Sequence, residues 1–206
     1  MNQRPSKPIP GVNLPKTQLG WDKFYALTGA AEKLFTRSSF HEVSVSDICR
    51  AAHTAVGTFY IYFETKTDLY RYLVEDYKRR IKQSLSESIA PCTTRLERER
   101  EGCKAFVMFS VKNPTVYNII WGSLAVDKQL FTDYYVSFAK SYARALTEDR
   151  EELCNPDVMT LSYALMGISS FLGLRAIFEK MSEAEVDKML DESFLPMIKE
   201  GIIRMP

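Results

Sequence analysis

The chain has 206 residues, of which 46% are hydrophobic and 26% are charged, and its formal net charge is +1. This length allows one or two domains, and the apolar fraction is ample for a sizeable core. Residues 1–90 carry 13 Lys and Arg against 9 Asp and Glu, whereas the remainder carries 14 against 17. The basic front part suits a polyanionic partner, although randomly placed surface charge also gives imbalances this small. The acidic remainder argues against nucleic-acid binding there.

The four cysteines show no CxxC spacing, and no signal peptide precedes them. Reduced thiols and a cytoplasmic location are therefore expected. Residues 1–20 are rich in proline and polar side chains. We interpret them as a mostly flexible tail.

The first helix is predicted from about Asp22 to Thr36. Its apolar stripe repeats at helical spacing and consists of Phe24, Leu27, Ala31, Leu34 and Phe35.

The segment from Ser44 to Lys66 predicts two short helices joined by a tight turn, followed by a third helix. Ser44 with Asp47 has the spacing of a capping box, and Thr65 with Asp68 repeats it. The second short helix is expected from about Ala55 to Tyr62, which gives helix-turn-helix spacing. Helices this short need neighbours to hold them, because helix nucleation is costly.

These residues resemble the DNA-binding region of the tetracycline-repressor (TetR) family. The resemblance rests on Ile48–Ala52, Gly57–Phe63 and Lys66–Leu69, and it covers about Phe24 to Leu73. His53-Thr54-Ala55 departs from the family's usual Gly-Val-Ser in the turn. His53 stands where glycine would favour a left-handed backbone, and Thr54 is expected to cap the recognition helix in place of the missing serine.

The resemblance implies DNA contacts from the recognition helix and its neighbours. Thr58, Tyr60, Tyr62 and Lys66 match family positions that hold the DNA backbone or base edges. Ser44 and Ser46 offer hydroxyl and backbone N–H donors to a phosphate. Tyr60 and Tyr62 have an alternative role as half-buried core aromatics, whereas Phe59 and Phe63 are expected in the core.

Base readout by the recognition helix should be weak in each half-site. Ala55–Phe63 contains no Arg, Lys, Asn or Gln, so the strongest bidentate base contacts are missing. Val56 can pack on a thymine methyl, and Thr54 can make a single hydrogen bond. Specificity would then depend on two-fold symmetry and DNA deformability.

The remaining chain is helical by pattern, so the expected fold is all-α with about nine helices. The fourth helix should run from Lys66 to about Ser88. Later helices should begin at Thr94, Asn113-Pro114, Asp127, Asn155-Pro156 and Ser182. We expect a tail over 1–20, a three-helix DNA-binding domain over 21–67, and a helical effector-binding and dimerisation domain over 68–206.

The C-terminal part is expected to supply a homodimer interface and, by the resemblance, a ligand pocket. The last two helices are apolar on wide faces and contain many small residues, which suits a four-helix bundle across a two-fold axis. The aromatic residues of the middle helices have an alternative role as plain core. The candidate ligand-binding residues are Phe109, Asn118, Trp121, Phe138, Tyr142 and Arg175.

Other functional classes have weaker support. Only His41 and His53 are present, and no phosphate loop, HExxH motif or nucleophile elbow appears, so an enzyme is not expected. A metal sensor using His41, Cys49 and His53, or a redox sensor using Cys92 and Cys103, remains an alternative. The apolar run Val158–Leu174 is short for a membrane span and is better explained as an interface helix.

The sequence therefore predicts a cytoplasmic, homodimeric transcriptional regulator without a cofactor. Its partners would be a double-stranded palindromic DNA operator and a small apolar or aromatic effector that releases it as a repressor.

Overall fold

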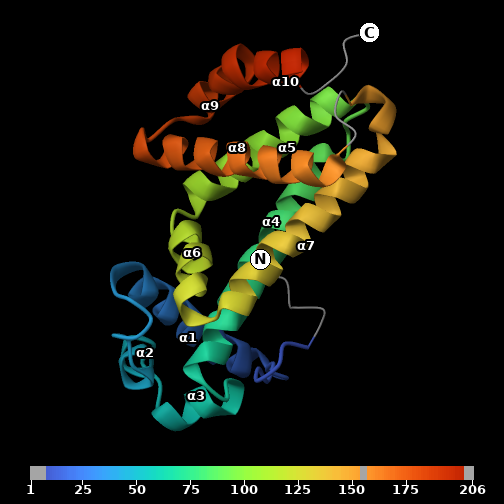
Figure 1. Ribbon diagram of the computed structural model, residues 1–206. Helices are drawn as coiled ribbons and strands as arrows, with labels where there is room; N and C mark the ends of the chain where they lie inside the picture. The colour runs from blue at the N-terminus through green and yellow to red at the C-terminus, as the bar shows by residue number, and fades with distance from the viewer. Residues whose placement is uncertain (1–7, 154–156, 202–206) are drawn as a thin grey trace. The chain divides into compact units, whose positions relative to one another are not determined.

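The computed structural model describes residues 8–153 and 157–201, which fold into helices (Figure 1). The helices are α1 (Gln18–Arg37), α2 (Val45–Ala51), α3 (Val56–Tyr62), α4 (Lys66–Ile89), α5 (Arg95–Lys112), α6 (Val116–Val126), α7 (Lys128–Glu148), α8 (Val158–Phe178), α9 (Glu183–Met189) and α10 (Leu195–Gly201). A π-helical turn, Leu190–Phe194, joins α9 to α10, and a 3-10 turn, Arg150–Glu152, follows α7. With α9 to α10 counted as one rod, the described residues form nine helices, and the all-α prediction is confirmed.

The predicted helix starts agree closely with the structure. Ser44, Thr94 and Ser182 each form the expected capping box with the acidic residue three positions later. α1 begins earlier than expected, because Thr17 caps it by accepting a hydrogen bond from Gly20 N. α6 starts two residues after Pro114. The expected start at Asn155-Pro156 lies outside the described residues, and the Asp157 side chain caps α8.

The chain divides into two compact units. The N-terminal unit comprises the residues up to Arg79 together with Thr115–Tyr134, and the C-terminal unit comprises Arg80–Pro114 together with the residues from Tyr135 onward.

An aromatic core holds the first helices of the N-terminal unit together. Phe24 of α1 is fully buried, and its ring lies 4.9 Å from Phe63 and 4.8 Å from Tyr72 of α4, measured between centroids. Ile48 of α2 and Phe59 of α3 are also fully buried, so each short helix is anchored by an apolar side chain. This anchoring supplies the support that such short helices need.

Polar contacts attach α6 to α1 and α4 within the same unit. The Thr115 hydroxyl, just before α6, donates to Glu32 Oε1 at 2.7 Å and lies 2.6 Å from the Tyr77 hydroxyl. The Tyr70 hydroxyl donates to the Ile119 carbonyl at 2.8 Å. A Cβ at Gly122 would lie 2.6 Å from that hydroxyl, so a larger residue there would displace the Tyr70 side chain.

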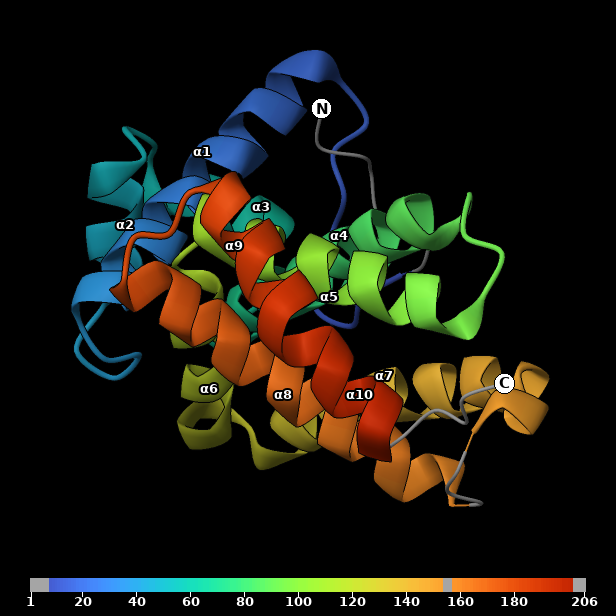
Figure 2. The same cartoon turned by 90° about the horizontal axis from the view of Figure 1, so that it is seen from above.

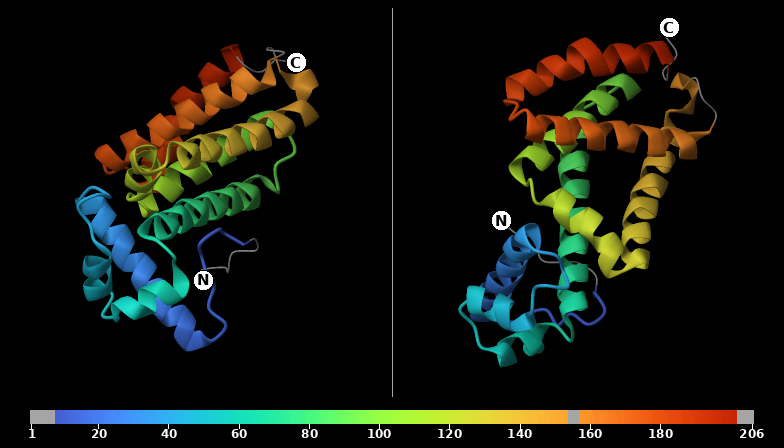
Figure 3. Two further views of the ribbon diagram at one scale, coloured as in Figure 1. Left: turned by 60° about the horizontal axis from the view of Figure 1, so that its bottom comes forward. Right: turned by 60° about the vertical axis from the view of Figure 1, so that its left-hand side comes forward.

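The C-terminal unit has its own apolar core between α5, α8 and the α9–α10 rod. The rod runs back along α8 in the opposite direction (Figures 2 and 3). The buried residues of this core include Cys103, Val107, Leu146, Leu161, Leu165, Ala176, Val186, Leu190, Phe194 and Ile198. Arg100 and Lys104 of α5 pair with Asp187 and Asp191 at the edge of this core.

The segment before α1 is more ordered than we expected. Within the predicted flexible tail, Val12 forms an isolated antiparallel bridge with Phe63. The Asn13 amide donates to the Tyr62 carbonyl at 2.8 Å. From Pro8 onward, the described part of this segment therefore belongs to the N-terminal unit.

Candidate nucleic-acid interface

The turn between α2 and α3 is built on a left-handed residue. His53 has a φ of 52°, which confirms that its position calls for the conformation that glycine adopts most readily. The Thr54 amide donates to the Cys49 carbonyl, and the His53 amide donates to the Arg50 carbonyl. This pair of bonds is a Schellman motif, which ends α2 and directs the chain into α3.

The outward face of α3 carries Val56, Tyr60 and Ile61. Tyr60 is 55% exposed, and Val56 and Ile61 are also exposed, while Thr58 is half-buried. Phe59 faces inward, as predicted. Sequence reasoning missed Ile61, although its neighbours at helical spacing indicated the outer face. The helix can thus offer a phenol hydroxyl to a phosphate and two aliphatic side chains to thymine methyl groups.

The start of α2, the helix that precedes α3 in the chain, has two exposed serines. Ser46 is exposed. The Ser44 hydroxyl accepts a bond from Asp47 N and donates to Asp47 Oδ2 at 2.5 Å, so the cap already uses it. These hydrogen bonds hold the pKa of Asp47 below its usual value, so the carboxylate stays ionised beside any phosphate. Ser46 is therefore the better placed of the two serines for a phosphate contact.

Tyr62 lies in the core rather than on the DNA-facing side of α3. It is buried, its ring packs edge-on against Phe24 at 5.6 Å, and its hydroxyl lies close to Gly20 at the start of α1. The physical reason is helical spacing: Tyr62 follows Phe59 by three residues and shares its inward face. The expectation of a phosphate contact from Tyr62 is not supported by this position.

Lys66 is directed toward the loop between α1 and α2. Its ammonium donates to the Phe40 and Val43 carbonyls, both at 2.6 Å, and lies 4.2 Å from the centre of the Phe40 ring. Burial lowers the pKa of Lys66. These contacts favour a clamp on the loop over the phosphate contact that we expected.

Thr54 does not cap α3. Ala55 occupies the N-cap, without a side-chain hydrogen bond in the described structure. Thr54 Oγ1 is buried beside the Cys49 thiol, so it is not available to a base either. Both expectations for Thr54 are therefore corrected, because the Schellman turn directs this side chain inward.

The six candidate ligand residues are divided between the two compact units. Asn118 and Trp121 belong to the N-terminal unit, where Asn118 Nδ2 donates to the Thr36 carbonyl and Trp121 packs edge-on against Tyr117. Phe109, Phe138, Tyr142 and Arg175 belong to the C-terminal unit. Arg175 pairs with Glu179 on the exposed side of α8, so the polar role expected for Arg175 inside a pocket is not supported.

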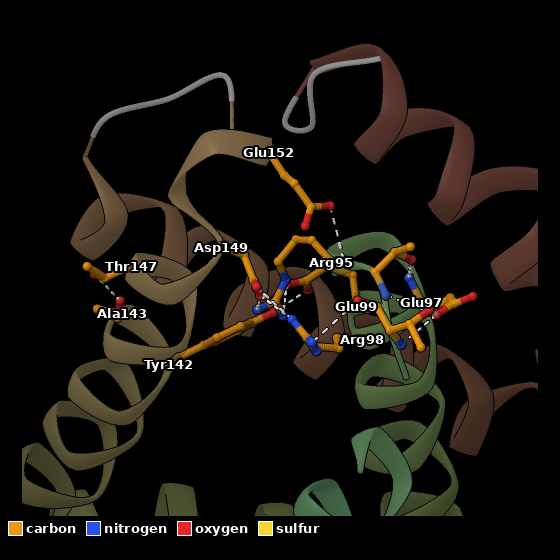
Figure 4. A network of polar contacts seen from close by, with 11 residues as sticks. Arg95, Glu97, Arg98, Glu99, Tyr142, Ala143, Thr147, Asp149 and Glu152 are labelled. Carbon is orange, nitrogen blue, oxygen red and sulfur yellow. Dashed lines mark hydrogen bonds and ion pairs between the residues drawn. The ribbon is translucent and has the colours of Figure 1, made fainter. Parts of the chain in front are cut away.

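A buried ionic network lies between the start of α5 and the end of α7 (Figure 4). Arg95 and Glu99 are only 3% and 2% exposed, and they pair at 2.5 Å. Arg95 and Arg98 both bind Asp149, and the Tyr142 hydroxyl donates to Glu99. Tyr142, a predicted ligand residue, is thus engaged in this network. The i,i+4 spacing of Arg95 and Glu99 was visible in the sequence, but its burial was not.

The thiols of the described cysteines, Cys49, Cys92 and Cys103, lie in surroundings unsuited to a reactive cysteine. Burial raises the pKa of Cys49 and raises that of Cys103 to about 12. The pKa of Cys92 is also raised, chiefly by desolvation. Within the described residues, no three His, Cys, Asp or Glu side chains gather in a way that could hold a metal ion.

The fold and this interface define a helix-turn-helix DNA-binding regulator. Residues 27–73 match the family model described as bacterial regulatory proteins, tetR family. The resemblance is therefore confirmed: the chain is a transcriptional regulator with a TetR-family DNA-binding domain. A sequence search of curated proteins finds no match.

Solved structures share the fold over most of the chain. NalD of Pseudomonas aeruginosa, the secondary repressor of the MexAB-OprM multidrug efflux pump, is 18% identical with a TM-score of 0.71, covering 91% of this chain and 98% of its own. A TetR-like transcriptional regulator from Rhodococcus sp. RHA1 is 18% identical with a TM-score of 0.68, covering 85% and 94%. The fatty acid degradation regulator FadR from Bacillus halodurans is 17% identical with a TM-score of 0.70, covering 82% and 94%.

Proposed function

We propose that this regulator is a cytoplasmic homodimeric repressor that binds a palindromic operator and is released by a small apolar effector. Regulators of the TetR family bind DNA and act as homodimers. In this proposal residues 21–67 read the DNA, and residues 68–206 supply the dimer interface and the effector site.

The observation that carries the proposal is the exposed apolar side of α8. Phe171 is 68% exposed and Phe178 is 75% exposed, and Met159 and Tyr163 of the same helix are exposed too. Only 28% of the apolar stretch of α8 is buried within the chain. Large apolar side chains gathered on one helix mark a contact surface, because exposing them to water costs free energy.

A second copy of the chain fits this surface best. α8 has the length and hydropathy of a membrane span, but it also carries Arg175 and several small hydroxylated residues. Pairing α8 and α10 of two copies across a two-fold axis would cover the exposed rings with identical rings. It would also supply two copies of α3, and two-fold related helices require a palindromic site.

The roles of the interface residues follow from their exposure. Tyr60 and Ser46 would bind phosphates and fix the register of the domain on the duplex. Val56 and Ile61 would pack on thymine methyl groups, while Thr58 would make at most a single hydrogen bond. Lys66 and Tyr62 would act indirectly, by holding the loop and the core behind α3.

An apolar effector agrees with the rings of the C-terminal unit. Phe109 and Phe138 are half-buried there, and we propose them as walls of the effector site, with Tyr142 nearby in sequence on α7. The relatives of similar fold include a repressor of a multidrug efflux pump and a regulator of fatty acid degradation. Fatty acids have long apolar chains, so the second of these relatives supports an apolar effector.

Binding-site selection from a randomised DNA pool tests the DNA-binding proposal. Wild-type protein should enrich a palindrome and have the mass of a dimer in solution. Tyr60→Phe should weaken binding to all duplexes alike, whereas Val56→Ala should relax the preference for thymine at one position of each half-site. Enrichment of a single, non-repeated half-site would contradict the palindromic operator.

Thermal melts with a panel of fatty acids and planar aromatic compounds test the effector. A true effector should raise the melting temperature of the wild type and lower its affinity for the selected duplex. Phe138→Ala should remove the response to the compound. Truncating a packed core ring lowers stability by about 3–5 kcal/mol. If Phe138→Ala has this cost and no compound raises the wild-type melting temperature, then these rings fill the core and form no effector site.

A further inference from the structure

The segment that precedes α1 reaches the C-terminal end of the recognition helix (Figure 1). We call Gly11, Val12 and Asn13 the N-terminal clamp. Val12 bridges to Phe63. The Asn13 amide donates to the Tyr62 carbonyl at 2.8 Å, and the Glu64 amide donates to the Gly11 carbonyl at 3.0 Å. The Asn13 side chain adds a bond from Nδ2 to the Ile61 carbonyl at 3.3 Å.

The recognition helix needs outside support at this end. α3 has seven residues and, at Ala55, no side-chain cap in the described structure. The last carbonyls of a helix have no partner within the helix. The carbonyls of Ile61 and Tyr62 instead accept hydrogen bonds from Asn13. Asn13 thus pairs with two carbonyls at the end of α3. Its backbone N–H donates to one of them, and its side-chain amide donates to the other.

The other side of the clamp rests on the start of α4. Gly11 has a φ of 71°, and a Cβ there would lie 2.3 Å from Asp68 Cγ. Asp68 is the acidic partner of Thr65 in the capping box at the start of α4: its Oδ2 accepts from the Thr65 backbone amide at 3.0 Å, and its Oδ1 accepts from Arg71 at 2.6 Å. Both the backbone conformation and the close approach therefore require glycine at position 11.

We propose that the N-terminal clamp is a positioning element for DNA recognition, which fixes the end of α3 relative to the start of α4. The proposal rests on DNA binding by the helix-turn-helix. Base contacts require the side chains of α3 to be held within a fraction of an ångström, whereas binding to phosphates tolerates more movement. Loosening the clamp should consequently weaken the specific complex more than the non-specific one.

Two clamp variants and a matched control test this role in the full-length protein. Gly11→Ala introduces the clash with Asp68 at a positive φ, and Asn13→Ala removes one side-chain donor from an exposed residue. Gly29→Ala is the control, because a Cβ at Gly29 meets open space. The probes are the duplex that the wild type enriches from a randomised pool and a scrambled duplex of equal length and composition, measured well below the melting temperature.

Asn13→Ala should weaken binding to the selected duplex about three- to tenfold, as expected for one lost hydrogen bond, and Gly11→Ala should weaken it more. Binding to the scrambled duplex should change by less than about twofold, and the salt dependence should keep its slope because no phosphate contact is lost. Hydrogen exchange at Phe59–Glu64 should become faster in both variants. Gly29→Ala should match the wild type in all these measurements.

Three results would overturn the inference. Equal weakening on both duplexes with a shallower salt slope would mean that the segment binds phosphates directly. A lower melting temperature with unchanged affinity would mean that the clamp only stabilises the fold. A wild type that enriches no duplex would overturn DNA recognition itself, whereas wild-type binding by both clamp variants would overturn the clamp alone.

Discussion

At the scale of single residues, the departures from the family pattern have clear physical outcomes. His53 takes the left-handed conformation that the sequence indicated, because the Schellman turn after α2 needs it whichever residue is present. Ala55 leaves α3 without a side-chain cap, and Thr54 does not supply one. α3 is therefore held chiefly by its buried residues and by the contacts at its C-terminal end.

Two left-handed residues give a matched pair of predictions. His53 and Lys180 have φ values of 52° and 53°, and each follows a helix end. A non-glycine residue is strained there, so His53→Gly and Lys180→Gly should each stabilise the fold by about 0.5–1 kcal/mol after the entropy cost of glycine. Differential scanning calorimetry of both variants checks this prediction. A fall in melting temperature for both would show that the side chains contribute more than the strain costs.

At the scale of helices, ionic contacts decide how α5 is joined to its neighbours. The sequence predicted the helix and its cap, but it did not predict that Arg95 and Glu99 are buried or that Arg100 and Lys104 meet α9. Burial depends on which elements pack over a residue, and this is a long-range property. The pocket role expected for Arg175 is not supported for the same reason, since helical spacing shows which residues share a face but not what covers that face.

The buried Arg95–Glu99 pair should be strongly coupled. Arg95→Ala leaves the Glu99 carboxylate buried without its cation and should destabilise the fold by about 3–5 kcal/mol. The double variant Arg95→Met with Glu99→Leu should cost much less than the sum of Arg95→Met and Glu99→Leu alone, because no uncompensated charge remains. Urea unfolding of the wild type and these four variants checks both expectations. Additive costs would mean that the pair contributes through packing alone.

The contact between α5 and α9 should depend on acidic pH. The Lys104 ammonium, 2.8 Å away, holds the pKa of Asp187 below its usual value of 3.8. A lowered carboxyl pKa contributes stability that is present above that usual value and is lost as the pH falls through the lowered pKa. Asp187→Asn should therefore cost about 1 kcal/mol at neutral pH, given its partial exposure.

That cost should shrink toward zero as the pH falls below 3.8. Chemical unfolding across this range, with the exposed Glu192→Gln as control, checks the sign. A cost that is independent of pH would show that Asp187 contributes a neutral hydrogen bond and no ionic attraction.

At the scale of the whole molecule, the proposed mechanism joins the effector site to DNA through chain segments shared by the two units. α4 and α7 each contribute residues to both units, and the boundary at Pro114 and Thr115 lies just before α6. Since α6 is bonded to α1 and α4 by Thr115 and Tyr70, a change transmitted along these segments would reach the helix-turn-helix. A population shift between two such arrangements would account for release.

Charge on the exposed side of α8 should separate the proposed dimer. Phe171→Glu combined with Phe178→Glu places four carboxylates in the proposed two-fold interface, so the variant should sediment as a monomer at micromolar concentration. It should also bind a single half-site as the wild type does, yet lose the preference for the full palindrome. Lys180→Glu, a change at an exposed residue beyond the end of α8, is the control. A double variant that stays dimeric would place the interface elsewhere.

The sequence by itself determined the helices, the capping boxes of α2, α5 and α9, the helix-turn-helix and the left-handed turn at His53, because each depends on interactions within a few residues. It also marked Phe59 and Phe63 as core, since their spacing is local. Only the tertiary structure decided that Tyr62 and Thr54 face inward, that Lys66 clamps a loop, that the segment before α1 pairs with the end of α3, and that α6 belongs with the DNA-binding helices. Each of these depends on contacts between residues distant in the chain, and a pattern of apolar and polar residues does not specify the partners of such contacts.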